Sequence, residues 1–123
     1  MNLVDSSAWL EYFADTQHAE HFVEVLGNTE ALIVPTIVLY EVIKVVQREM
    51  GKNAALQVQA AIQKGIIVPL DANLAAMAAS LSLQYNLPMA DSIILATAVK
   101  HDATIWTLDS HFEKLSGVKY FKK

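Results

Sequence analysis

Short runs of β-branched and aliphatic residues alternate with longer helical patterns along the whole chain. The runs "NLVD" (2–5), "ALIVP" (31–35), "IIVPL" (66–70), "TIWTLD" (104–109) and "VKYF" (118–121) predict strands. Strands that alternate with helices are typical of a parallel sheet with helices on both faces. The strongly hydrophobic strands indicate burial on both sides. We therefore expect an α/β fold with three layers, in which helices flank a mostly parallel central sheet.

The intervening segments have helical periodicity, and several end at a glycine. The predicted helices span residues 6–27 (with a break allowed near Asp15), 36–50, 53–65, 72–85, 88–101 and a short segment at 110–115. The chain has 123 residues, 54% of them hydrophobic and 18% charged, and it contains no repeat, low-complexity tract or linker. These properties are typical of one folded domain, which we expect to span residues 1–123.

Composition also bears on location and partners. The most hydrophobic stretch, "ALIVPTIVL" (31–39), is too short to span a bilayer, and no secretory signal is apparent. The absence of cysteine fits a cytoplasmic protein and excludes disulfides and thiolate metal sites. A net charge of −4 argues mildly against non-specific nucleic-acid binding, although a bound metal would offset carboxylates devoted to it. We expect a cytoplasmic protein that does not contact membranes.

Four carboxylates occupy similar places in the predicted elements. Asp5 closes the first strand and Asp109 closes the fourth. Glu41 lies in the second turn of the helix that follows the second strand, and Asp91 lies in the first turn of the helix at 88–101. Ligands of open α/β sheets bind outside the carboxyl ends of the strands. We therefore expect these four side chains to gather at one edge of the sheet.

The segment "LPMADSIILATA" (87–98) allows a simpler explanation for Asp91. The helix is apolar almost all round, which is typical of a buried helix. An Asp in its first turn, just after Pro88, could merely cap the helix. Yet two carboxylates about 4 Å apart repel by roughly 4 kcal/mol at an effective dielectric of 20. A converging set therefore needs a cation, shifted pKa values or a wider spread, and oxygen ligands of this kind suit Mg²⁺ or Mn²⁺.

At these residues the sequence resembles the PIN-domain ribonucleases, and within that family the VapC toxins of bacterial and archaeal toxin–antitoxin pairs. The matching segments are "LVDSSAWLEYF" (3–13), "VLYEVIKVV" (38–46), "LPMADSIILATA" (87–98) and "TIWTLDSHF" (104–112). They occur in the order that the family has, and together they span essentially the whole chain.

The resemblance implies a PIN-like fold and a metal-dependent endoribonuclease that leaves a 5′-phosphate and a 3′-hydroxyl. It implies Mg²⁺ or Mn²⁺ as cofactor, RNA as substrate, a cognate VapB-like antitoxin and a homodimer. A PIN nuclease of RNA processing without an antitoxin is the alternative. The residues that the family pattern places at the site are the catalytic and metal-binding Asp5, Glu41, Asp91 and Asp109, with supporting hydroxyls on Ser6 and Thr107.

Other residues near these motifs allow two interpretations each. Ser6 could cap the first helix, which we favour, or act at the metal. Lys44, Arg48 and Lys52 follow Glu41 at helical spacing and could form a basic stripe that binds RNA, or a solvated face on which Glu41 pairs with Lys44. His111, two residues after Asp109, could contact substrate.

Two other enzyme classes also place an Asp after the first strand of such a sheet. A phosphatase of that kind would need a second Asp two residues later, where this chain has Ser7. A receiver-type phosphoacceptor would need an acidic pair at the end of the first strand, and only Asp5 is present there. Both classes are therefore disfavoured.

Overall fold

The computed structural model describes residues 1–123, and five parallel strands form its centre. The strand order is β3-β2-β1-β4-β5, and every neighbouring pair is parallel. β1 lies in the middle, so Leu3 is in register with Ile33 on one side and Ile105 on the other. The strands are β1 Asn2–Val4, β2 Leu32–Pro35, β3 Ile66–Val68, β4 Thr104–Thr107 and β5 Val118–Tyr120. The predicted α/β architecture is confirmed, and the sheet is entirely rather than mostly parallel.

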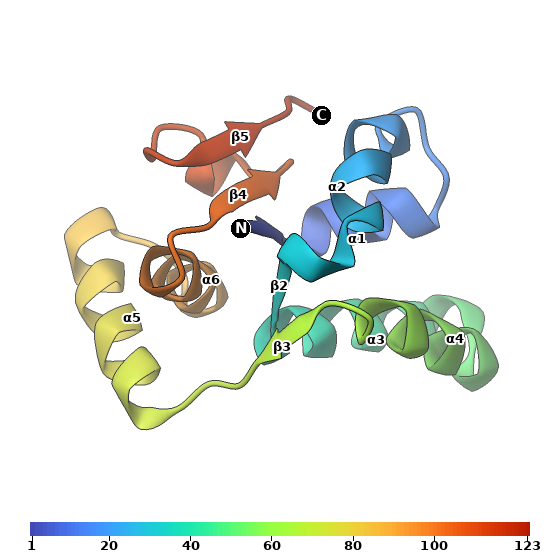
Figure 1. Ribbon diagram of the computed structural model, residues 1–123, viewed down its shortest axis with the longest axis horizontal. Coiled ribbons are helices and arrows are strands. Elements are labelled where there is room, and N and C mark those ends of the chain that lie inside the picture. Colours follow the sequence, from blue (N-terminus) through green and yellow to red (C-terminus); the bar gives the residue numbers. More distant parts are fainter.

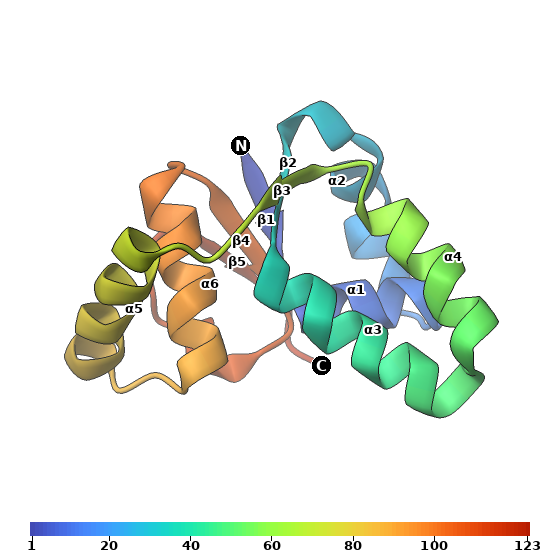
Figure 2. The same cartoon turned by 90° about the horizontal axis from the view of Figure 1, so that it is seen from below.

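Six α-helices cover the two faces of this sheet (Figure 1). α5 and α6 lie side by side on one face, while α1, α2 and the α3–α4 pair lie on the other, and a second view shows the same division (Figure 2). The helices are α1 Ser6–Phe13, α2 Val23–Gly27, α3 Thr36–Met50, α4 Lys52–Ile62, α5 Ala72–Tyr85 and α6 Met89–Lys100. The result is the expected three-layer domain.

Two predicted helices are shorter in the structure. The segment at 6–27 breaks after α1, and Asp15 adopts a left-handed backbone conformation with φ 53°. Asp tolerates this conformation better than most residues do, so the chain can turn there into a 3₁₀ turn, Ala19–Phe22, that precedes α2. The predicted helix at 110–115 is only a 3₁₀ turn, Ser110–Phe112.

Gly51 separates α3 from α4. Its φ of 91° is a conformation that residues with a Cβ rarely adopt, and the first helix therefore ends at Met50. Lys52 begins the second helix instead of continuing the first. The prediction of one stripe through Lys44, Arg48 and Lys52 is therefore wrong for Lys52, because helical spacing does not carry across the break.

The core is formed by the strands and by the helix faces that pack on them. Leu3, Val4 and Val34 are fully buried, as the hydrophobic strand sequences predict. All eight residues of α6 from Asp91 to Ala98 are buried, which confirms that this apolar helix lies inside the molecule. A carboxylate is therefore carried into the interior on the first turn of a buried helix.

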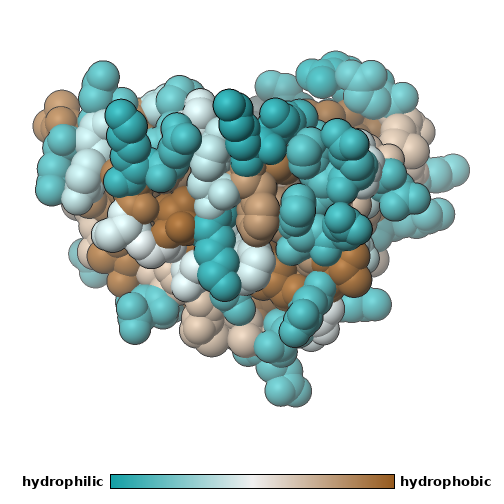
Figure 3. Space-filling view, turned by 90° about the horizontal axis from the view of Figure 1, so that it is seen from above, coloured by the Kyte–Doolittle hydropathy of each residue, from teal (hydrophilic) through white to brown (hydrophobic).

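The surface is mainly hydrophilic where the C-terminal end, β5 and α2 lie, with small hydrophobic areas between polar side chains (Figure 3).

None of the helices combines the length and the hydrophobicity that crossing a bilayer would require.

Candidate functional site

The four predicted acids lie in the loops and helices that follow the carboxyl ends of the strands. Asp5 directly follows β1, and Asp109 lies two residues beyond β4. Glu41 is on α3, which continues from β2, and Asp91 is in the first turn of α6. Burial is the main cause that raises the pKa of each of the other three carboxyls, and the charge of Asp109 adds to it in all three, so Asp109 lies within electrostatic reach of them.

Asp5 is buried, with 2% of its surface exposed, and it caps α1. Its Oδ1 accepts hydrogen bonds from the Ala8 amide at 3.2 Å and from the Ser7 hydroxyl at 2.6 Å. Its Oδ2 accepts one from the Thr107 hydroxyl at 2.6 Å. Burial nevertheless raises the pKa of Asp5 to about 6, because these hydrogen bonds only partly replace the lost hydration.

Hydrogen bonds fasten the loop after β4 to the start of α1. Thr107 Oγ1 donates to Asp5 and accepts from the Asp109 amide at 2.8 Å. Ser7 Oγ donates to Asp5 and accepts from the Leu108 amide at 3.1 Å. Both hydroxyls thus act as donor and acceptor at once, and they fix the position of Asp109 relative to Asp5. The sequence offered no signal for Ser7, because any small residue could follow Ser6 in a helix.

Ser6 does not cap α1, contrary to the favoured prediction, because Asp5 already fills that role. Ser6 Oγ instead donates to Glu41 Oε1 at 3.1 Å and so joins α1 to α3 across 35 residues of sequence. Glu41 is half-buried, and burial, with a smaller contribution from Asp109, raises its pKa. This contact orients the glutamate and leaves its Oε2 without a protein partner.

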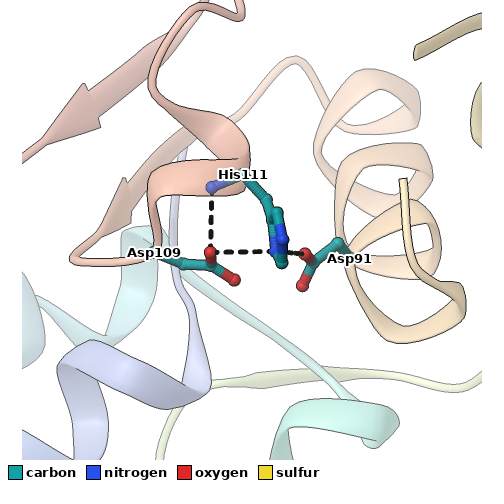
Figure 4. A group of neighbouring side chains, drawn as sticks. All are labelled: Asp91, Asp109 and His111. Atoms are coloured by element: carbon teal, nitrogen blue, oxygen red, sulfur yellow. Dashed lines mark hydrogen bonds and ion pairs between the residues drawn. The ribbon is translucent and has the colours of Figure 1, made fainter. Parts of the chain in front are cut away.

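Asp91 and Asp109 face each other with the His111 ring between them (Figure 4). His111 Nδ1 lies 2.8 Å from Asp91 Oδ2 and 3.1 Å from Asp109 Oδ1. The potential ligand atoms of these three residues all lie within 4.8 Å of one another. Burial, followed by the charge of Asp109, raises the pKa of Asp91 to about 6, and the same charge is the largest cause that raises the pKa of His111.

Asp91 makes no capping hydrogen bond, so the capping explanation is wrong, although its place in the first turn of α6 suits the helix dipole. Pro88 occupies the capping position of α6, and no side chain there accepts a capping hydrogen bond. Asp91 Oδ2 is buried without a well-aligned hydrogen bond, and its short contact with His111 is an ion-pair contact. A buried carboxylate oxygen without a well-aligned hydrogen bond is stabilised by a positive charge beside it.

The donor set fits a hard divalent cation. Carboxylate oxygens of Asp91 and Asp109 converge, and the buried Oδ2 of Asp91 has only the His111 ring beside it, in a contact that is not a well-aligned hydrogen bond. Asp5 and Glu41 lie outside this compact group, which is the only one of its kind in the chain. Thr107 links Asp5 to the Asp109 amide, and Ser6 links Glu41 to the first turn of α1, next to Asp5. His111 joins the group as a direct neighbour of two acids, a contact that its position two residues after Asp109 only hinted at.

A surface cavity elsewhere on the molecule does not contain these acids. Its volume is about 540 Å³, and it lies beside β5 and α2. It is lined by Asn2, Glu20, His21, Glu24, Val25, Asn28, Trp106 and Lys119. Because it holds no converging set of acids, we place the chemistry at the carboxylates.

A family model described as "PIN domain" matches residues 3–118 of this chain. The chain belongs to the PIN domain family. The match spans β1 to the start of β5 and includes all four acids. No curated protein matches this PIN domain in sequence.

Solved structures share the fold of this PIN domain. One is a toxin–antitoxin complex from Klebsiella pneumoniae, with a TM-score of 0.84 and 22% identity over 97% of this chain and 96% of that one. VapC20 from Mycobacterium tuberculosis, described as a toxin that cleaves the sarcin–ricin loop, has a TM-score of 0.77 and 18% identity over 94% and 95%. FitAcB from Neisseria gonorrhoeae has a TM-score of 0.74 and 23% identity over 99% and 97%. At these identities the likeness shows a common fold.

Proposed function

We propose that this PIN domain is a metal-dependent endoribonuclease and the toxin of a VapBC-type toxin–antitoxin pair. The observation that carries the proposal is the convergence of the buried Asp91 and the partly exposed Asp109, with Asp5 and Glu41 within electrostatic reach of Asp109. The family and the toxin–antitoxin structures that share the fold support it. The corresponding partners are an RNA substrate, a VapB-like antitoxin and a second copy of the chain, all in the cytoplasm.

Asp91 and Asp109 would hold Mg²⁺ or Mn²⁺, with Asp5 and Glu41 contributing from the margin of the group. When bound, such an ion lowers the pKa of a coordinated water and offsets the charge that develops on a scissile phosphate. His111 lies between the two acids and would have to give up at least one of these contacts.

The residues of this chain would then position the reacting groups. Thr107 and Ser7 hold Asp5 in a single orientation, and Ser6 holds Glu41 with one carboxylate oxygen free to accept a hydrogen bond from water. Attack by water would form a new P–O bond at the scissile phosphate while the bond to the 3′ oxygen breaks. The products would be a 5′-phosphate and a 3′-hydroxyl, and the 3′ oxygen would take up a proton.

Lys44 and Arg48 on α3 would contact RNA phosphates one to two turns beyond Glu41. Both are exposed, and with Gln47 they line a surface hollow of about 350 Å³. Lys52 would add a more distant contact from the start of α4. Phosphate contacts of this kind would make RNA binding depend on salt.

The decisive experiment compares RNA cleavage by Asp91→Asn with that by the wild type. Total RNA is incubated with each protein in Mn²⁺, in Mg²⁺ and in EDTA. We expect the wild type to cleave with metal but not in EDTA, and Asp91→Asn to lose detectable cleavage, because one of the two converging carboxylates becomes neutral. Asp102→Asn is the matched control: Asp102 is exposed, it precedes β4 at the opposite edge, and its left-handed φ of 50° also suits Asn.

Cleavage by Asp91→Asn at the wild-type rate would contradict the assignment of the site. Growth separates a toxin from a nuclease of RNA processing. Induced expression of the wild type should arrest growth, Asp91→Asn should not, and a small protein encoded next to the gene should relieve the arrest. Cleavage without arrest would favour the processing nuclease.

A further inference from the structure

Tyr40 on α3 has the most exposed ring of any Tyr, Trp or Phe in the chain, with 58% of its surface exposed. Single exposed hydrophobic residues are common on protein surfaces and do not by themselves indicate a site. The residues next to Tyr40 on α3, however, include a candidate site residue and a lysine that could bind a phosphate.

Tyr40 lies beside the candidate site. It directly precedes Glu41, which the Ser6 hydroxyl holds at 3.1 Å. Lys44 is four residues from Tyr40 and three from Glu41, so that it neighbours both side chains on the helix surface. Helical side chains lean toward the N-terminus of their helix, and here that end adjoins the carboxyl edge of the sheet. Lys44 Nζ lies 5.6 Å from the centre of the Tyr40 ring. The ring and the ammonium group thus form one unit on the helix that carries Glu41.

Two basic residues, Lys44 and Arg48, lie close to Tyr40 on α3 in an acidic protein. The net charge of the chain is −4, and the third basic residue of this region, Lys52, begins α4 and does not extend their helix face. Arg48 is paired only with Glu49 at 3.1 Å, and both side chains are 62% exposed. Such an exposed pair is weak, so a phosphate can compete for the arginine. Lys44 and Arg48 are thus two cations available to the phosphates of a polyanion.

We propose that Tyr40 and Lys44 form a subsite for one nucleotide of a single-stranded RNA that flanks the scissile bond. The base stacks on the Tyr40 ring, and its phosphate contacts Lys44 Nζ. An unstacked base offers its flat face to an aromatic side chain whatever its identity, so this subsite positions the strand without reading its sequence. The inference rests on the proposed nuclease function and names residues that would guide its substrate.

Binding to RNA with and without bases tests the stacking contact. The probes are four fluorescent homopolymeric 12-nucleotide RNAs and an abasic 12-mer with the same backbone charge, measured by anisotropy in EDTA to prevent cleavage. We expect the wild type to prefer the RNAs that carry bases. Tyr40→Ala should weaken their binding by about 5- to 150-fold and leave the abasic 12-mer unaffected. Tyr40→Phe should bind like the wild type, because the ring is retained.

Tyr85→Ala is the matched control, since Tyr85 is an exposed tyrosine of similar size at the end of α5, with 45% of its surface exposed. It should bind every probe like the wild type. Lys44→Ala should weaken binding to all probes, including the abasic one, and reduce the slope of log K against log salt by about 0.7, the value for one phosphate contact on a single strand.

If Tyr40→Ala bound base-containing RNA as tightly as the wild type, the proposed subsite would be overturned. An equal loss of affinity for the abasic probe would also overturn it. A change in the oligomeric mass of Tyr40→Ala by light scattering, with RNA affinity unaltered, would also overturn it and assign Tyr40 to an interface between copies. These results leave the nuclease proposal intact if the wild type cleaves RNA with Mn²⁺. A wild type that neither binds nor cleaves RNA would overturn both.

Discussion

Thr107 shows how one residue can organise a site without carrying a charge. Its buried hydroxyl donates to Asp5 and accepts from the Asp109 amide, so that two acids from different strands share one support. A protein that buries a carboxylate must supply hydrogen bonds to it, because unpaired buried polar groups are destabilising. The resemblance predicted a supporting hydroxyl at Thr107, and the structure shows which atoms it holds.

Thr107→Val should therefore destabilise the protein by about 1–3 kcal/mol, since it leaves Asp5 Oδ2 and the Asp109 amide without their partner. Thr107→Ser keeps the hydroxyl and loses only a buried methyl group, so its effect should be closer to about 1 kcal/mol. Urea unfolding at pH 7.5 measures both. Equal losses for the two variants would show that packing of the methyl group, and not the hydroxyl, is what matters.

At the level of helices, two similar-looking acids have opposite roles. Asp71 caps α5, because its side chain accepts a hydrogen bond from the Leu74 amide at 2.8 Å. Asp91 stands in the first turn of α6 and makes no capping bond. Propensity alone predicts a capping role for both. The difference arises because the N-terminal end of α6 lies next to Asp109 and His111, toward which Asp91 turns.

The two acids should respond differently to neutral substitution. Asp71→Ala should lower the free energy of unfolding by about 1 kcal/mol, the usual effect of losing a cap. Asp91→Asn in metal-free buffer at pH 7.5 should not lower it, because the change removes a buried charge and no capping bond. Thermal or urea unfolding in EDTA compares them. A loss for Asp91→Asn as large as that for Asp71→Ala would indicate that Asp91 supports the helix after all.

At the level of the whole molecule, the burial of carboxylates makes the stability of the protein depend on pH. The pKa values of Asp5 and Asp91 are raised to about 6, those of Glu41 and His111 are also raised, and burial is the main cause for the three carboxyls. A group whose pKa is higher in the folded state binds more protons there than in the unfolded chain. The stability that such a group contributes is fully present below its pKa in the unfolded chain. It is lost as the pH rises through its pKa in the folded protein.

The metal-free protein should therefore become less stable as the pH rises from 5 to 7.5. Asp5 alone should account for about 1–3 kcal/mol of this change. Glu11, whose pKa is lowered by Lys123, loses its contribution only at more acidic pH, below this window. Urea unfolding in EDTA across this range measures the slope, and Asp5→Asn should flatten it. Mn²⁺ at pH 7.5 should restore stability, because a ligand that binds the folded state stabilises it. A flat profile for the wild type would contradict the burial of charged carboxylates.

The sequence by itself determined the parallel α/β architecture, the buried α6 and the strand ends at which the acids stand. Local periodicity indicates these elements, and strands joined by helices pair in parallel, which brings their carboxyl ends to one edge of the sheet. Only the tertiary structure decided that Asp5 rather than Ser6 caps α1, that Ser7 links α1 to β4, and that Asp91 faces His111. These choices depend on side chains brought within hydrogen-bonding distance from segments up to about a hundred residues apart, where no local pattern reaches.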